Sequence, residues 1–583
     1  MGDGTLSHGD YNSLAEAFAA LPDTTTRGPI VVCIEEGVHR VTRPIVVTQD
    51  RVVIRGCGPN TRIEAPRGAF TLEGRRQITF TDLMIESPDA PGISAHDVRE
   101  LTIRDSRIRM SQLVQTSKPV TIERAGNAAA AGSATAAPRA SSGKPIIEPG
   151  LTFHFRRPPA LLLQGWEMNV IRTEVRGSTT GGGIAILPGS GDVTICDNNI
   201  HKSVLPGIDF SYAAAASDGR LEMRLNSVGA AFESITIRDN TITDIAAPAI
   251  FHDVVVTPVK TTGQDVAGAV GAATMPALIS DLTIEGNLVA RCGPGDGTRQ
   301  FLPTAPLEGA IMLAYVERLS MVGNRIIENG RRYPSYVGVV VEWSEGVVLK
   351  ENLISLNGRL LQEGAARPGA GGAIFQFALP ESAELVGSAT QGWPAIVAEE
   401  NTIDAVNGPA LLVNGTGTMR IRGNMLSNRN AKPTLRSACL LVMNIGSTEE
   451  TDSSFEQAFG NYVNAGSPGE GKRSPLTDAG GMTMVADNQI VTVSAESSAG
   501  YGSVVLSRDD VSFSNNQVRV KTDEGMLINV MVTAPTLRVV GNRFSEPLDG
   551  AVVSCIGIGD MVVGAANQAT HCLIFDGLYA TVP

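Results

Sequence analysis

The sequence predicts an all-β solenoid, a fold in which short strands wind into coils that stack along one axis. A six-residue phrase, LTIEGN at 282–287, recurs along most of the chain in variants such as ITIRDN at 235–240. Apolar and polar residues alternate in each copy, as in a strand, and the closing Gly, Asp or Asn residues bend the chain. Asn401 and Asn424, which end two successive copies, lie 23 residues apart. A period of roughly 20 to 50 residues is typical of a solenoid.

The asparagine that ends each phrase is predicted to be structural. If the coils stack at about 4.8 Å, it falls at the same corner of every coil. There its amide bonds to the asparagines above and below, and Asn tolerates the left-handed backbone that we expect at this corner. Leu83 and Ser106 occupy the position in early coils, so the ladder is expected to be absent there. The predicted members are Asn198, Asn240, Asn287, Asn324, Asn352, Asn401, Asn424, Asn488, Asn516 and Asn542.

These phrases resemble the repeats of the right-handed parallel β-helix superfamily, which includes pectate lyases, polygalacturonases and phage tailspikes. The resemblance implies a single-stranded right-handed parallel β-helix over residues 30–583, preceded by an N-terminal segment over residues 1–29. It is specific for the fold and weak for function, because one fold hosts many chemistries.

A short helix is predicted in the N-terminal segment. Ser13 and Glu16 have the spacing of a capping box, and Leu14, Phe18 and Leu21 place apolar groups on one face. In the superfamily such a helix commonly covers the open end of the coil. We expect the same here, because an uncovered end is a row of unpaired strand edges.

Four insertions interrupt the coils without disturbing the phrases that follow. They lie near 118–158, 213–231, 255–278 and 446–480. Such segments are expected to be loops on one side of the solenoid, where most of the freedom to specialise resides. The stretch 125–150 is rich in Ala, Gly and Ser, and it has too little apolar area to offset the entropy of ordering. We expect it to be mobile and dispensable.

Composition narrows the functions that the chain can have. A formal charge of −13 and the lack of a basic stripe argue against nucleic-acid binding. The seven cysteines are scattered and have no zinc-site spacing, so we expect reduced thiols, no metal and no cofactor. The sequence shows neither a signal-peptide pattern nor an apolar run long enough for a membrane span. We expect synthesis in the cytoplasm, and either assembly into a particle that the cell releases or excision from a longer chain.

Candidate catalytic residues lie on a second set of strands between the phrases. Alternation sends Asp209, Asp253, Glu342 and Asn414 outward on the face that carries the active cleft in carbohydrate-acting members of the superfamily. Asp253 and Glu342 are predicted to lie two coils apart, hence about 9 to 10 Å. That distance is near the upper end of the carboxylate separation in an inverting glycosidase. The alternative is two solvated carboxylates without a catalytic role.

The motifs of the superfamily's enzymes are missing. Asp509 and Asp510 are adjacent, but the Asn-Thr-Asp and Gly-His-Gly runs of polygalacturonases do not accompany them. No dense Asp cluster suits the calcium of a pectate lyase. His252 is predicted to point inward, where a packed histidine is commoner than a general base. His96 points outward without a carboxylate partner on its own face.

The aromatic residues indicate a candidate ligand site around the loop ENGRRYPSY at 328–336. Aromatic faces beside guanidinium groups and the carboxylate of Glu342 suit a sugar or an acidic glycan. The alternative is that the rings cover the edge of a coil. The candidate residues are Tyr315, Arg331, Arg332, Tyr333, Tyr336 and Trp343.

The sequence therefore predicts a rigid β-helix binding or structural module, such as a glycan- or receptor-binding spike of a phage-tail-like or contractile injection particle. The expected partners are a polysaccharide or cell-surface glycan and tail or baseplate proteins. The resemblance to tailspikes, which are often trimers, implies a possible homo-trimer, although the sequence shows no trimer-forming segment. One alternative is a polysaccharide lyase or glycoside hydrolase that uses Asp253, Glu342 and Arg331 or Arg332. Another is a scaffold domain of a larger protein without a ligand.

Overall fold

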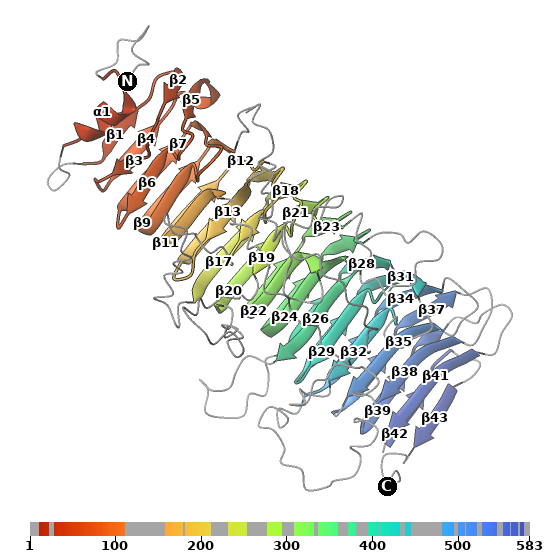
Figure 1. Ribbon diagram of the computed structural model, residues 1–583. Helices are drawn as coiled ribbons and strands as arrows, with labels where there is room; N and C mark the ends of the chain where they lie inside the picture. The colour runs from red at the N-terminus through yellow and green to blue at the C-terminus, as the bar shows by residue number, and fades with distance from the viewer. Residues whose placement is uncertain are drawn as a thin grey trace, which may run out of the picture.

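The chain is nearly all β, with parallel strands stacked into a long rod (Figure 1). The computed structural model describes residues 11–22, 28–110, 158–178, 181–211, 231–252, 277–293, 308–330, 336–358, 371–379, 394–406, 408–431, 438–444, 481–494, 500–507, 509–521, 527–544, 552–559, 561–568 and 572–576.

The strands form three columns, which we name A, B and C in the order in which the chain visits them in each coil. Column A holds the strands of the recurring phrase. These are β1 (Ile30–Cys33), β4 (Val52–Arg55), β7 (Arg76–Thr81), β14 (Gly191–Cys196), β17 (Phe232–Arg238), β20 (Ile279–Glu285), β27 (Ile396–Glu399), β30 (Met419–Arg422), β33 (Thr483–Ala486), β36 (Val511–Ser514), β39 (Thr536–Val540) and β42 (Met561–Ala565).

Column B follows the asparagine corner. Its strands are β2 (Gly37–Arg40), β5 (Thr61–Glu64), β8 (Met84–Glu86), β10 (Arg107–Arg109), β12 (Glu174–Arg176), β15 (Asn199–His201), β18 (Thr241–Thr243), β21 (Leu288–Ala290), β23 (Arg325–Ile327), β25 (Leu353–Ser355), β28 (Thr402–Val406), β31 (Met425–Ala431), β34 (Gln489–Ser494), β37 (Gln517–Lys521) and β40 (Arg543–Phe544).

Column C completes each coil. Its strands are β3 (Ile45–Val47), β6 (Phe70–Glu73), β13 (Gly182–Ile186), β16 (Ile208–Asp209), β19 (Ile250–His252), β26 (Ala373–Leu379), β29 (Leu411–Gly415), β32 (Leu440–Asn444), β35 (Gly500–Ser507), β38 (Leu527–Thr533), β41 (Val552–Gly559) and β43 (Cys572–Asp576). Four long strands run from column C into column A, namely β9 (Ile93–Arg104), β11 (Pro159–Ile171), β22 (Glu308–Val322) and β24 (Tyr336–Lys350).

Pairing within the columns is parallel from one coil to the next, so the described chain is a parallel β-helix. Column B is a separate 15-stranded sheet, whereas the four long strands join columns A and C into one 28-stranded sheet. Every coil therefore encloses an interior that neighbouring coils continue.

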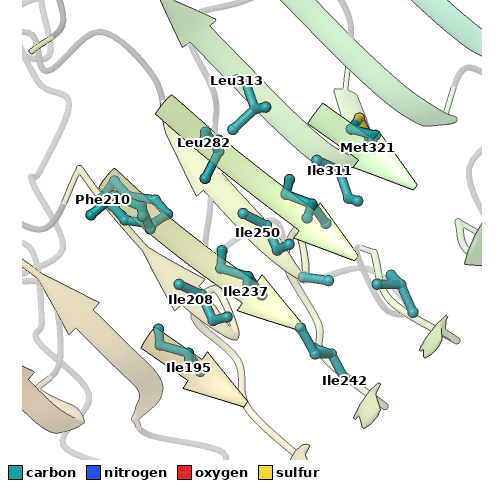
Figure 2. Packing of buried hydrophobic residues seen from close by; sticks show 14 of the residues in the cluster. Ile195, Ile208, Phe210, Ile237, Ile242, Ile250, Leu282, Ile311, Leu313 and Met321 are labelled. Atoms are coloured by element: carbon teal, nitrogen blue, oxygen red, sulfur yellow. The ribbon is translucent and has the colours of Figure 1, made fainter. Parts of the chain in front are cut away.

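The core fills this interior with inward-facing side chains in register. Ile195 pairs with Ile237, which pairs with Ile284, and Figure 2 shows Ile195 and Ile237 among the buried side chains of the core. Burial of each such side chain contributes about 1.5–3 kcal/mol to stability. Because the alternation of apolar and polar residues sets which side chains turn inward, one continuous core runs along the rod.

The predicted N-terminal helix is present as α1 (Leu14–Ala19), which the Ser13 Oγ caps by accepting from the Glu16 N–H at 3.2 Å. Its buried face includes Phe18, whose ring centroid lies 5.8 Å from that of Phe70 on β6. The helix therefore packs on the first coils. That it serves as their cover stays a prediction.

The structure contains the asparagine ladder at the corner between columns A and B. In each step the Nδ2 of one asparagine donates to the Oδ1 of the next at 2.9–3.1 Å. All ten predicted asparagines belong to it, and Asn567 extends it by one coil beyond the prediction. In the early coils the Ser106 Oγ accepts from the Leu83 N–H instead, so the ladder begins later, as expected.

The left-handed residue at this corner is not the asparagine, contrary to the prediction. It is the residue before it, for example Asp197 with φ 57°, Gly286 with φ 62° or Glu351 with φ 56°. The preceding residue makes the bend, while the asparagine turns its amide into the buried corner to reach its neighbours.

A second, shorter ladder lies at the corner between columns B and C, and the sequence analysis missed it. The Asn329 Nδ2 donates to the Asn357 Oδ1 at 2.9 Å, and the Asn329 Oδ1 accepts from the Cys292 N–H at 2.8 Å. The signal was present in the sequence as ENG at 328–330 and LNG at 356–358.

Nearly all residues of the four predicted insertions lie outside the described residues. The stretch 125–150 is among them, and its mobility stays a prediction. Within the described ranges, Cys33, Cys57, Cys196, Cys292 and Cys439 form no disulfide, and the structure shows no group of three or more metal-ligating side chains. No helix in these ranges is long and apolar enough to cross a membrane.

Candidate functional site

The outer face of column C, where the sequence analysis placed the candidate acids, carries an apolar stripe. The stripe consists of outward residues that pair in register from strand to strand. They are Phe251, Met312, Val340, Ile374, Leu412 and Leu441. All are buried except Leu412, which is half-buried. The middle of this face is thus apolar and not a row of polar catalytic groups.

Two of the outward carboxylates, Asp209 and Glu342, lie at different places along the stripe. Asp209 pairs with Phe251 in the stripe, is only 4% exposed, and its Oδ1 accepts from the Ser211 N–H at 2.8 Å. Glu342 and Asn414 lie two residues after Val340 and Leu412, hence at the next outward position. Asp253 lies outside the described residues.

The strands that should carry Asp253 and Glu342 are two coils apart, because β22 pairs with both β19 and β24. The register of these strands agrees with the predicted spacing. The distance between the two carboxylates stays a prediction.

The two histidines take the orientations that the alternation predicts. His252 is in register with Leu313 in the core, and its ring centroid lies 6.2 Å from that of Phe232. Burial lowers the pKa of His252 to about 4, so the imidazole is neutral at neutral pH. His96 lies toward the outside and its Nε2 lies 3.1 Å from the Ser94 Oγ. His252 is therefore a core residue without access to the outer face.

Tyr336 does not belong to a surface site. It is fully buried, and its ring packs against the backbone of Gly330 and Gly293. A Cβ added at Gly293 would lie 3.0 Å from the Tyr336 Cζ, so glycine provides the space for the ring. Burial raises the pKa of the Tyr336 hydroxyl well above its ordinary value. The sequence could not reveal this orientation, because it depends on Gly293 from the preceding coil as well as on Gly330.

Of the other predicted ligand residues, Arg331, Arg332 and Tyr333 lie outside the described residues. Tyr315 and Trp343 remain, and they are paired neighbours on β22 and β24. Their ring centroids lie 6.1 Å apart at an interplanar angle of 84°, an edge-to-face arrangement, and both side chains are half-buried.

Two carboxylates lie near Tyr315 in this ring pair. Burial raises the pKa of the Tyr315 hydroxyl, and the negative charges of Glu345 and Glu317 raise it further. The Glu317 Oε2 accepts from the Ser280 Oγ at 3.1 Å, which fixes that carboxylate. Glu342 directly precedes Trp343 in β24. We call Tyr315, Trp343, Glu317, Glu342 and Glu345 the aromatic–acidic site.

One further feature was not predicted, a groove of about 420 Å³ along the corner between columns A and B. It brings together Asp105, Arg107, Arg172, Glu174 and Asn199. The polar outward positions were visible in the sequence. Their proximity was not, because Asp105 and Arg172, which form an ion pair, are 67 positions apart in the sequence.

Comparisons with known proteins give similarity in fold alone. No protein-family model and no curated protein sequence matches the chain. Among solved structures, an alginate lyase, AlyF-OU02, in complex with G6 is 12% identical, with a TM-score of 0.33, over 90% of this chain and 83% of that one. PfbA, a surface adhesin of Streptococcus pneumoniae, is 9% identical with a TM-score of 0.32, over 90% and 83% of the two chains.

A third structure is the Dettilon tailspike protein, which is 10% identical, with a TM-score of 0.29, over 67% of this chain and 62% of that one. The likeness to these three structures concerns the fold alone.

Proposed function

We propose that the chain is a rigid β-helix binding module that holds a neutral carbohydrate at the aromatic–acidic site. The observation that carries this proposal is the half-buried edge-to-face pair of Tyr315 and Trp343 with carboxylates beside it. Aromatic faces pack against the apolar C–H faces of a sugar ring, and carboxylates accept hydrogen bonds from its hydroxyl groups. The negative charge of Glu317 and Glu345 disfavours an anionic glycan at the same place.

The scaffold suits precise binding, because the two rings sit on strands and not on loops. Strands β22 and β24 pair in parallel from Glu308 and Tyr336 to Val322 and Lys350. Their spacing is therefore set by backbone hydrogen bonds before a ligand arrives. A preorganised site loses little conformational entropy on binding.

The separation of the described carboxylates on column C favours a binding function over a catalytic one. Asp209 and Glu342 lie three coils apart along β16, β19, β22 and β24, which corresponds to about 14 Å. An inverting glycosidase holds its two carboxylates at about 6.5–9.5 Å. One carboxylate oxygen of Asp209 also accepts a hydrogen bond from the Ser211 N–H, so Asp209 is a poor catalytic partner for Glu342.

The test is whether the protein retains a glycan without cleaving it. Affinity electrophoresis measures binding to neutral glucans, mannans and chitin fragments, and to alginate and polygalacturonate. The release of reducing ends or unsaturated products reports cleavage. We expect retention by a neutral glycan, weaker retention in Trp343→Ala, and no cleavage. Trp166→Ala is the matched control, because Trp166 on β11 is 39% exposed and lies outside the site.

Retention that is equal in the wild type and in Trp343→Ala would contradict the proposal. Cleavage that disappears in Glu342→Gln would replace it by the alternative, a polysaccharide lyase or glycoside hydrolase. Circular dichroism spectra of all variants serve to exclude loss of the fold as the cause.

We also infer that the coil is right-handed and that α1 covers its first turns. Parallel strands in one sheet are joined by right-handed crossovers in about 98% of cases, which supports the handedness. The packing of Phe18 on Phe70 supports the position of the helix. Assembly of the module into a particle, a homo-trimeric state and synthesis in the cytoplasm stay proposals from the sequence.

A further inference from the structure

The groove between columns A and B lies well before the aromatic–acidic site in the rod. It runs along the corner residues that follow β7, β9, β11 and β14, so it spans four successive coils, about 14 Å from first to last. Its walls come from both sides of the corner, and the exposed Pro59 of a short 3₁₀ helix, η2 (Gly58–Asn60), adds apolar surface.

Glu174 is the centre of the charged wall on column B. Its two carboxylate oxygens accept from the Arg109 Nη2 at 2.9 and 3.0 Å. The Arg107 Nε lies 3.4 Å from its Oε2, and the His201 Nε2 lies 3.4 Å from its Oε1. Burial raises the pKa of the Glu174 carboxyl, but the hydrogen bonds and charges of Arg109 and His201 outweigh that effect and lower it. Glu174 is thus ionised and fixed by residues of the two neighbouring coils.

A second ion pair forms the opposite wall at the corner itself. The Arg172 Nε and Nη2 donate to the two Asp105 oxygens at 2.7 and 3.0 Å. This bidentate hydrogen bond and the charge of Arg172 lower the pKa of the Asp105 carboxyl. Asp197, exposed in the next coil, extends the same wall. The groove therefore has its polar groups oriented before any ligand binds.

The charges of the groove nearly cancel. The carboxylates of Asp105, Glu174 and Asp197 face the guanidinium groups of Arg107 and Arg172 in the lining, with Arg109 directly behind Glu174. A ligand with a net charge gains little from such a balanced field. A ligand with many hydroxyl groups gains more, since a carboxylate accepts up to about four hydrogen bonds and a guanidinium donates up to about five.

Several of these groups retain capacity for a ligand. Arg107 approaches Glu174 through its Nε at 3.4 Å, which leaves its terminal nitrogens available. The Asn199 side chain is exposed at the groove and offers a donor and an acceptor. Pro59 is exposed and presents an apolar surface that suits the C–H face of a sugar ring.

We propose that this groove is a second carbohydrate site, which takes a neutral oligosaccharide along the corner between columns A and B. The hydroxyl groups of the ligand bond to Arg107, Asp197 and Asn199, and one of its rings packs on Pro59. This second site is independent of the aromatic–acidic site. Residues on or beside β7 to β15 form the groove, whereas residues of β22 and β24 form the aromatic–acidic site.

The experiment uses the full chain with Trp343→Ala, so that the aromatic–acidic site does not contribute. Isothermal titration calorimetry measures the affinity for hexasaccharides of glucose, mannose and N-acetylglucosamine. Hexamannuronate serves as the acidic probe. We expect one neutral hexasaccharide to bind, and Arg107→Ala to weaken its affinity by about tenfold, the effect of losing a hydrogen bond to a charged group. Arg176→Ala is the matched control, since Arg176 is exposed on β12 but does not line the groove.

A second readout locates the ligand. Carbodiimide labelling of carboxylates, followed by mass spectrometry, should show protection of Asp197 by the bound hexasaccharide. Asp239 should not be protected, because it is the exposed equivalent of Asp197 one coil later and does not line the groove. If Arg107→Ala lowers the melting temperature, Asn199→Leu at an exposed position takes its place.

Three results would overturn the second site. They are the absence of binding by every neutral hexasaccharide, tighter binding of hexamannuronate, and equal protection of Asp197 and Asp239. Failure of the aromatic–acidic site gives a different pattern, in which Trp343→Ala has no effect while the groove variants do.

Discussion

The Asn324 Nδ2 donates to the Asn352 Oδ1 in the next coil at 2.9 Å. The same amide nitrogen donates to the Ile284 carbonyl oxygen in the preceding coil at 2.7 Å. One buried side chain thus ties three coils together. Because every coil from Asn198 to Asn567 repeats this arrangement, the ladder holds the coils in register along most of the rod.

Replacement of Asn324 by Leu should destabilise the protein by roughly 1–3 kcal/mol. The Asn287 N–H and Nδ2, which both donate to the Asn324 Oδ1 at 3.0 Å, would lose their acceptor in a buried corner. Urea denaturation followed by circular dichroism measures the effect. Arg325→Leu is the matched control, because Arg325 is the next residue and is exposed. Equal stability of the two variants would contradict a structural role for the ladder.

The residue before each ladder asparagine should tolerate glycine and reject β-branched side chains. Glu351 has φ 56°, and glycine stands at the equivalent place as Gly286, Gly323, Gly423 and Gly541. Glu351→Val should destabilise by about 1–2 kcal/mol, the penalty of the left-handed conformation for a residue with a Cβ that branches. Glu351→Gly should stay within about 1 kcal/mol of wild type, since relief of strain offsets lost entropy.

The variant Glu351→Gln separates the effect of the side-chain charge on stability from the effect of the backbone conformation. The Lys350 Nζ lies 3.4 Å from the Glu351 Oε1 in an exposed pair, which contributes little. We therefore expect Glu351→Gln to match the wild type in urea denaturation. A loss as large as that of Glu351→Val would mean that the ion pair and not the backbone conformation decides stability here.

His252 should make the fold sensitive to mild acid. Its pKa is about 4 in the folded protein against an ordinary value of 6.5. Between these values the unfolded chain binds a proton that the folded protein does not, so stability falls as the pH drops from about 6.5 toward 4. With about 1.36 kcal/mol per pKa unit, the loss approaches about 3 kcal/mol.

The variant His252→Leu removes this titration. Its melting temperature should change less between pH 7.5 and pH 4.5 than that of the wild type, whatever its absolute stability. Thermal unfolding at both pH values measures the difference. An equal change in the two proteins would show that other groups cause the acid sensitivity.

Much of the fold could be read from the sequence, because its signals are local and repeated. Alternation within each phrase fixes which side chains face inward, and the asparagine at each phrase end marks the corner in every coil. Even so, the left-handed residue was assigned one position too late. Both the asparagine and its predecessor suit that conformation, and only the inward bonding of the amide distinguishes them.

The candidate sites needed the tertiary structure, because they join residues of different coils across segments of unequal length. Tyr336 turns into the core where Gly293 and Gly330 leave space, so one of the four aromatic residues of the predicted surface cluster is not at the surface. The groove exists because Asp105 and Arg172, which are 67 positions apart in the sequence, become neighbours. The sequence by itself determined the strand, the corner and the rod, which depend on period and alternation. The structure alone decided which charges and rings meet, because that depends on the register between neighbouring coils.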